Sequence, residues 1–305
     1  MKNKTCVIIV GPTAVGKTSV AIEIASKFNT QILSADSRQC YKELTIGVAK
    51  PSPEQLQKIK HYFINSHSVE EEVNAKVFEL YALQKVSEIF QTSEVAVMVG
   101  GTGLYIKAFC EGMDEVPFVD VGINQTIIKN YNNGGIEWLS KEVKKIDPLF
   151  FNKGEIKNPQ RMMRALEVRL STGKSILEFH SHKKKERYFN IIKIGLEIPK
   201  EQLHQNINNR VDEMINGGLM DEVKSLLSFK DLNALQTVGY RELFTHLGGE
   251  LSLEEAIERI KISTRQYAKR QITWFKKDKE VEWFNPMNII EMLSYIKQKS
   301  TNNLC

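Results

Sequence analysis

The sequence predicts an α/β fold, in which a parallel sheet of the P-loop type carries helices on both faces and holds one helical insertion domain. Three observations support this prediction. Short apolar, β-branched runs recur along the chain, helical patterns separate them, and the first run leads into a glycine-rich phosphate-binding motif. Strands that alternate with helices favour a parallel sheet that is covered on both faces.

Four segments have the composition of buried strands. Each is short, apolar and rich in β-branched residues, which is typical of a strand buried on both faces. These segments are 7–10, closed by Gly11; 31–35; 95–99, closed by Gly100 and Gly101; and 191–198, ahead of Pro199. Helical patterns lie at 18–28, at 77–90 and in a long series after Pro199.

The stretch from Glu115 to Ser181 differs from its surroundings. It has helical periodicity and turn signals such as Asn133-Gly134-Gly135, but no comparable strand run. We therefore expect residues 1–114 to form the first part of the P-loop core and residues 115–181 to form a helical insertion domain. Residues 182–305 would complete the core and add basic C-terminal helices.

Composition limits the class of protein. A chain of 305 residues can bury a full α/β core, and a net charge of +5 suits a polyanionic partner but is also common among cytosolic enzymes. The four cysteines are far apart, which predicts reduced thiols and no structural zinc. No segment has the length of a membrane span or the pattern of a signal peptide, so we expect a soluble, cytoplasmic protein without a membrane partner. With no apolar stripe evident for a partner subunit, we expect a monomer.

A phosphate-binding loop follows the first predicted strand and opens the first predicted helix. Its residues fit G-x-x-x-x-G-K-[ST] as Gly11-Pro12-Thr13-Ala14-Val15-Gly16-Lys17-Thr18. The backbone N–H groups and the positive helix end can surround an anion, Lys17 can neutralise it, and Thr18 can hold Mg²⁺. The alternative is a glycine turn that binds nothing. Any diphosphate or triphosphate presents the same oxygens, so the motif indicates a chemical group and not a substrate.

The third predicted strand ends without the Walker-B carboxylate of ordinary P-loop ATPases and GTPases. It leads instead into Gly100-Gly101-Thr102-Gly103-Leu104-Tyr105. Glycines at this point would let the backbone approach a phosphate closely, and the Thr102 hydroxyl could bond a diphosphate oxygen. A helix cap is the alternative role for Thr102.

A carboxylate follows the second predicted strand. Asp36 would lie at the carboxyl edge of the sheet, where ligands of open α/β folds bind. A carboxylate there can orient or deprotonate an acceptor, an effect of roughly 10²- to 10⁴-fold in rate. An N-cap or a Mg²⁺ ligand are the alternatives. The neighbouring Ser37 and Gln39 are short polar groups that suit the edge of a base.

Two basic segments are candidates for nucleic-acid contact. Gln160, Arg161 and Arg164 open a predicted helix, where the two arginines share one face and could hold a phosphodiester backbone. Eight lysines and arginines lie between residues 259 and 279, opposed within that window only by Asp278. Arg265 and Lys269 share one face of this strip, and clustered cations favour phosphate binding through counterion release. A solvated helix face is the alternative for both segments.

Taken together, these segments resemble the tRNA dimethylallyltransferase family, isopentenyltransferases that modify adenosine 37 next to the anticodon. A P-loop alone is unspecific, but an ordered series of motifs spans nearly the whole chain. The series is GPTAVGKT (11–18), SADSRQCYKELTIGVAKP (34–51), VGGTGLY (99–105), NPQRMMRALEV (158–168), NNRVDEMINGGLMDEV (208–223), VGYRE (238–242) and RQYAKRQITWF (265–275).

The resemblance implies a reaction and the residues that perform it. The loop would hold the diphosphate of dimethylallyl diphosphate, so that ATP is not a phosphoryl donor. Asp36 would be the general base toward the exocyclic amine of adenine. Thr102 and Arg210 would steady the departing diphosphate, together with Lys17 and a Mg²⁺ ion held partly by Thr18.

The resemblance also implies the tRNA contacts. The target adenine would be extruded from the anticodon stem-loop, and the insertion would be a mobile lobe that closes over the stem. Two positions depart from the family pattern, since Asn124 and Asn206 stand where arginines are usual. The implied tRNA-binding residues are Asp36, Ser37, Arg38 and Gln39 after the second strand, and Gln160, Arg161, Met162, Met163 and Arg164 in the insertion.

Two other functions compete with this one. A small-molecule or nucleoside kinase would keep the P-loop and could use Asp36 as a base toward a hydroxyl, but an adenine pocket and a lid with paired arginines are not evident in the sequence. A non-catalytic RNA-binding P-loop protein would bind tRNA and form no product.

Overall fold

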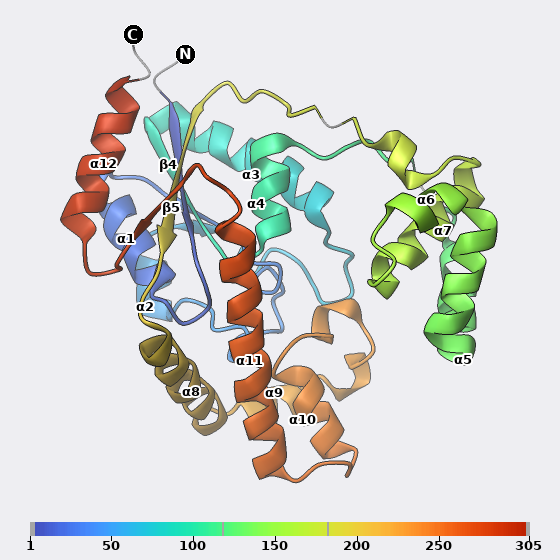
Figure 1. Cartoon of the computed structure of the whole chain (residues 1–305). Helices are drawn as coiled ribbons and strands as arrows, with labels where there is room; N and C mark the ends of the chain where they lie inside the picture. Colours follow the sequence, from blue (N-terminus) through green and yellow to red (C-terminus); the bar gives the residue numbers. More distant parts are fainter. Residues whose placement is uncertain (1–3, 118, 182, 303–305) are drawn as a thin grey trace. The chain divides into compact units, whose positions relative to one another are not determined.

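The chain divides into two compact units, which Figure 1 shows in a computed structural model. The structure describes residues 4–117, 119–181 and 183–302. Unit 1 contains Met1–Glu111 and Lys185–Cys305, and unit 2 contains Gly112–Lys184. The sequence led us to expect the borders at 114/115 and 181/182.

Unit 1 is built on a six-stranded sheet in which every described pairing is parallel, in the order β3-β2-β4-β1-β5-β6. The four runs identified in the sequence form four of its strands, which confirms the predicted fold class. The search for apolar, β-branched runs did not reveal the two edge strands, because these strands are short and most of their residues are partly exposed. The strands are β1 (Thr5–Val10), β2 (Ile32–Ser34), β3 (His61–Tyr62), β4 (Val95–Val99), β5 (Asn190–Leu196) and β6 (Val281–Phe284).

Helices cover both faces of this sheet. Helices α1 (Lys17–Lys27) and α12 (Ile289–Asn302) lie on one face, and α3 (Ala75–Thr92) and α4 (Gly103–Glu111) lie on the other (Figure 1). Every residue of β1 is buried, as a central strand covered twice requires. One core cluster joins alternate residues of β1 to α1 and α12, and burying each aliphatic side chain there contributes about 1.5–3 kcal/mol.

The remaining helices of unit 1 are α2, which lies between β2 and β3, and a series that follows β5. Helix α11 starts at a complete capping box formed by Ser252 and Glu255, and it packs against α8 and α10. None of the helices in the described ranges is both long and apolar enough to cross a membrane. These elements are α2 (Pro53–Lys58), α8 (Lys200–Asn216), α9 (Leu219–Ser225), η2 (Leu227–Phe229), η3 (Asn233–Leu235), α10 (Tyr240–Leu247) and α11 (Leu253–Phe275).

The regular elements among the described residues of unit 2 are all helices. It contains α5 (Val121–Ile146), α6 (Pro148–Lys153), α7 (Pro159–Thr172) and η1 (Ile176–Phe179). The expected turn at Asn133-Gly134-Gly135 appears as a kink inside α5, where Gly135 has φ of 62°. A separate apolar core, which includes Leu139, Val143 and Phe150, holds these helices together.

Candidate active site

The P-loop joins β1 to α1 and curls around its own lysine. The Lys17 Nζ atom donates to the carbonyl oxygens of Gly11 at 3.0 Å and Pro12 at 2.6 Å. A Cβ atom on Gly11 would lie 2.8 Å from the backbone oxygen of Leu196, and its φ of 144° also favours glycine. The backbone at this point therefore passes so close to β5 that only glycine fits.

Positive charge is crowded around Lys17. Burial, together with the charge of the nearby Arg210, lowers the pKa of its ammonium group to about 7, while Asp36 opposes the shift. Burial also lowers the pKa of Arg210. Lys17 and Arg210 repel one another electrostatically, so an anion that binds near both is strongly stabilised.

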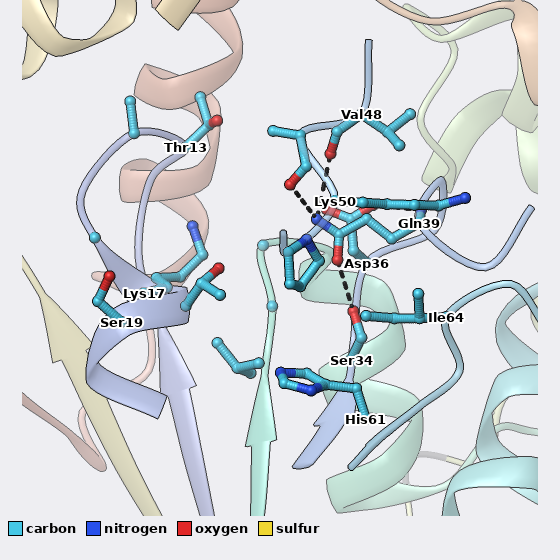
Figure 2. A pocket seen from close by; sticks show the side chains of 18 of the residues that line it. Thr13, Lys17, Ser19, Ser34, Asp36, Gln39, Val48, Lys50, His61 and Ile64 are labelled. Carbon is cyan, nitrogen blue, oxygen red and sulfur yellow. Dashed lines mark hydrogen bonds between the residues drawn. The ribbon is translucent and has the colours of Figure 1, made fainter. Parts of the chain in front are cut away.

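A cavity of about 260 Å³ opens over this loop (Figure 2). Lys17, Thr13 and Ser19 lie on one side of it, and Gln39, Val48, Ile64 and His61 lie on the other. We call it the donor cavity. Its lining combines the cationic P-loop with apolar side chains, which include Val48, Pro51, Ile64 and Val99.

A second cavity of about 340 Å³ adjoins the first. We call it the acceptor cavity. Its own walls include Arg38, Arg241 and Arg270, which suits a polyanion. Both cavities are lined by Thr13, Asp36, Val48, Ala49, Arg210 and Tyr267.

Asp36 lies where the two cavities meet. Its Oδ1 atom accepts the backbone N–H groups of Arg38 at 2.9 Å and Gln39 at 3.3 Å. Within the described part of the chain, Oδ2 makes no hydrogen bond. Oδ1 therefore caps the turn after β2, which corresponds to the capping role that was the alternative for Asp36. Oδ2 stays available as a base.

Thr102 has a different partner from the one expected. Its hydroxyl accepts the Ser37 backbone N–H at 3.0 Å and donates to the Ser37 hydroxyl at 3.4 Å. It is not among the residues that line either cavity. In this arrangement Thr102 holds the turn that carries Asp36.

Gln39 is also occupied within the protein, although we expected it to face a base. Its Oε1 accepts the Ser34 hydroxyl at 3.1 Å, and its Nε2 donates to the carbonyl oxygens of Val48 at 3.2 Å and Ala49 at 3.1 Å (Figure 2). The loop that it holds is fastened from its other side by Glu222, which accepts the N–H groups of residues 45–47. Gln39 thus shapes the wall shared by both cavities.

The glycines after β4 are closely packed by protein groups, and Gly100 and Gly101 also line the donor cavity. A Cβ atom on Gly100 would overlap the backbone of Ala35, one on Gly101 would overlap the amide of Gln271, and one on Gly103 would overlap the ring of Trp274. Segments distant in sequence occupy this space, so a local pattern could not reveal its use.

Helix α11 supplies site residues that the sequence did not single out. Thr264, Tyr267 and Gln271 lie on one helix face, and each lines at least one cavity. Burial raises the pKa of Tyr267 to about 12, and the charge of Asp36 acts in the same direction, so the phenol stays protonated near neutral pH. The helical 3.6-residue periodicity of RQYAKRQ was the signal in the sequence that could have revealed this face.

The basic strip of α11 is partly neutralised by acids of the same helix and of other segments. Arg265 pairs with Glu258 at 3.2 Å and donates to Asn208 at 3.0 Å, so one of its predicted tRNA contacts already has protein partners. Two further lysines of the strip also pair with acids, in Lys261–Asp212 and Lys276–Glu197, both at 2.6 Å. Lys269 is exposed at the surface.

In unit 2, the predicted tRNA-binding residues of α7 divide by burial. Gln160, Arg161 and Arg164 are exposed, but Met162 and Met163 are 0% and 6% exposed within the unit's own core. We expected both methionines to contact tRNA, and their burial argues against any such side-chain contact. Their positions in the repeat direct them inward.

The two asparagines that stand where the resemblance implies arginines bond other groups. Asn124 donates to Glu167 at 2.6 Å, and the same carboxylate pairs with Arg164 at 3.1 Å. Asn206 donates to the Ala14 carbonyl of the P-loop at 3.2 Å. Each therefore steadies a neighbouring candidate element.

The low pKa of Lys17 predicts a pH dependence of anion binding. A bound diphosphate raises this pKa, so binding above pH 7 takes up a proton and the affinity falls as pH rises from about 7 toward the pKa of the bound state. Titration calorimetry with inorganic diphosphate at pH 8, in buffers of different ionisation enthalpy, measures this uptake. Lys17→Arg keeps the cation but makes its charge independent of pH, so equal uptake in this variant would contradict the assignment.

Comparisons with known proteins bear on the whole chain. A family model described as IPP transferase matches residues 39–278. The chain is 42% identical to tRNA dimethylallyltransferase 1 of Bacteroides thetaiotaomicron, over 98% of this chain and 97% of that protein. It is 46% identical to a tRNA dimethylallyltransferase of Christiangramia forsetii, over 95% and 97%.

Solved structures agree with these matches. The tRNA isopentenylpyrophosphate transferase of Bacillus halodurans is 33% identical with a TM-score of 0.73, covering 99% of this chain and 98% of that one. A eukaryotic dimethylallyltransferase acting on tRNA is 25% identical with a TM-score of 0.78, covering 97% and 77%.

Proposed function

Because this chain belongs to the IPP transferase family, we propose that it is a tRNA dimethylallyltransferase. It transfers the dimethylallyl group of dimethylallyl diphosphate to the N6 amine of adenosine 37 in tRNA and releases diphosphate. One observation supports placing this reaction at the candidate site. The cavity over the P-loop adjoins an arginine-lined cavity, and Asp36 and Arg210 line both of them.

The donor cavity suits the allylic diphosphate. Lys17 and the N–H groups at the start of α1 bind the diphosphate, and the apolar wall with Val48 and Ile64 contacts the hydrocarbon tail. As the bond between C1 and oxygen breaks, negative charge builds up on the leaving group. Lys17 and Arg210 stabilise this charge more in the transition state than in the ground state.

The site also fits a Mg²⁺ ion that binds with the substrate. The described residues contain no cluster of three or more His, Cys, Asp or Glu side chains that could hold a metal, which suits an ion that takes most of its ligands from diphosphate and water. The Thr18 hydroxyl, which lines the donor cavity, is the protein ligand we assign to it. When bound, Mg²⁺ would neutralise charge on the diphosphate oxygens.

Asp36 performs the proton transfer. The exocyclic amine is a weak nucleophile because its lone pair is delocalised into the ring, so its proton must leave as the nitrogen bonds to C1. The free Oδ2 of Asp36 accepts that proton, while Oδ1 stays fixed by the turn. The Thr102–Ser37 hydrogen bond supports this turn.

The acceptor cavity suits an extruded nucleotide of the anticodon stem-loop. Arg38, Arg241 and Arg270 can contact the phosphates around the target base. In unit 2, the exposed Gln160, Arg161 and Arg164 are the tRNA-binding group that remains from the sequence prediction. We expect the protein to act as a monomer in the cytoplasm, where its tRNA substrate is found.

Label transfer tests this function directly. Incubating the protein with radiolabelled dimethylallyl diphosphate, unmodified tRNA and Mg²⁺, without ATP, should place the label at adenosine 37. A tRNA with guanosine at position 37 is the matched control and should stay unlabelled. Transfer of the γ-phosphate of ATP without any prenyl transfer would support the kinase alternative instead.

A further inference from the structure

A buried amide from α11 bridges the two turns that form the phosphate side of the donor cavity. The Oε1 atom of Gln271 accepts the backbone N–H of Thr13 at 2.8 Å, and its Nε2 atom donates to the Gly101 carbonyl at 3.0 Å. Gln271 is 6% exposed and lines the cavity together with both partners. The three residues are 258 and 170 positions apart in the chain, so only the fold brings them together.

The surroundings are shaped to admit this bridge. A Cβ atom on Gly101 would overlap the Gln271 amide nitrogen, so glycine is needed there to make room for it. The Thr13 N–H, which belongs to the P-loop, is directed to Gln271 and is therefore not offered to a phosphate. The first half of the P-loop is therefore bound by the protein, whereas the second half remains available to bind the ligand.

Helix α8 holds the same half of the loop. Arg210 donates to the Thr13 hydroxyl at 3.3 Å, and Asn206 donates to the Ala14 carbonyl at 3.2 Å. The bonds from α8 and α11 thus fix residues 13 and 14 before any ligand arrives. Preorganised donors stabilise developing charge more than donors that must reorient, because no reorganisation is needed during the reaction.

We infer that Gln271 is a positioning residue for the diphosphate: by holding Thr13 against Gly101, it sets the geometry of the phosphate-binding loop for the leaving group. This inference rests on the proposed function for the identity of the leaving group. A buried amide that only stabilises the fold would also have its hydrogen bonds satisfied. The test must therefore distinguish an effect on the geometry of the phosphate site from an effect on the stability of the protein.

Gln271→Met tests the inference, since methionine keeps the approximate volume and removes both hydrogen bonds. We expect it to weaken the binding of inorganic diphosphate and to lower kcat for prenyl transfer, each by about 10- to 100-fold, with the Kd for tRNA unchanged. Gly101→Ala displaces the same amide from the other side. Its effect on diphosphate binding should match, and the double variant should be little worse than either single variant, because both break one contact.

Gly103→Ala is the matched control. Its Cβ atom would overlap the ring of Trp274, also on α11, but neither residue is among those that line the donor cavity or the acceptor cavity. This variant should lower the melting temperature without changing the diphosphate Kd. The inference is overturned if Gln271→Met lowers only the melting temperature, or if Gly103→Ala weakens diphosphate binding equally. Diphosphate binding is measured without prenyl transfer, so a wild-type protein that binds diphosphate but never prenylates tRNA would refute the proposed function alone.

Discussion

Replacing Asp36 by asparagine should lower kcat for prenyl transfer by roughly 10²- to 10⁴-fold, the effect of losing a general base. The amide keeps an oxygen that can accept the N–H groups of Arg38 and Gln39, so the turn after β2 should stay in place. It cannot take up the proton of the attacking amine. Single-turnover transfer of labelled dimethylallyl groups to tRNA measures this loss.

Binding measurements separate this effect from misfolding. The Kd values of Asp36→Asn for tRNA and for inorganic diphosphate should stay within a few-fold of the wild type. Asp221→Asn makes the same chemical change on the exposed start of α9 and should leave turnover unchanged. Near-normal turnover by Asp36→Asn would remove this carboxylate from the proton transfer.

Replacing Arg210 by methionine should lower kcat by roughly 10²- to 10³-fold, because a fixed cation next to the leaving group is lost. Arg210 is the one cationic residue that lines both cavities in the described structure, and it bonds Thr13 of the P-loop. Charge builds up on the diphosphate as its bond to carbon breaks, so the loss should appear mainly in kcat. Steady-state kinetics with each substrate varied in turn measures this division.

Arg241→Met is the comparison for Arg210, since it removes a cation that lines only the acceptor cavity. It should raise KM for tRNA, reduce the salt dependence of tRNA binding, and leave kcat nearly unchanged. If the two variants behaved alike, the two cavities would not divide donor from acceptor as proposed.

Local patterns in the sequence were sufficient for the core of the fold and for much of the site. Central strands of a covered parallel sheet must be apolar along their whole length, so β1, β2, β4 and β5 were evident. The P-loop and Asp36 were found because each follows such a strand and so lies at its carboxyl end. The family resemblance, which rests on these ordered motifs, is confirmed by the comparisons.

Residues whose role depends on which partner the fold brings within reach were not predictable in this way. Gln39 has the chemistry to read a base, yet it bonds Val48 and Ala49, and the charge of Arg265 is met by Glu258 and Asn208. Residue type shows what a side chain can bond, but not which partner lies within reach.

The sequence by itself determined the parallel sheet, the phosphate loop, the carboxylate beside it and the family. The tertiary structure alone decided that Gln271 and Tyr267 of α11 belong to the site, and that the glycines after β4 admit protein side chains. The physical reason is the range of the interactions. Strand burial and loop geometry follow from neighbouring residues, whereas contacts across more than a hundred positions exist only once the chain has packed.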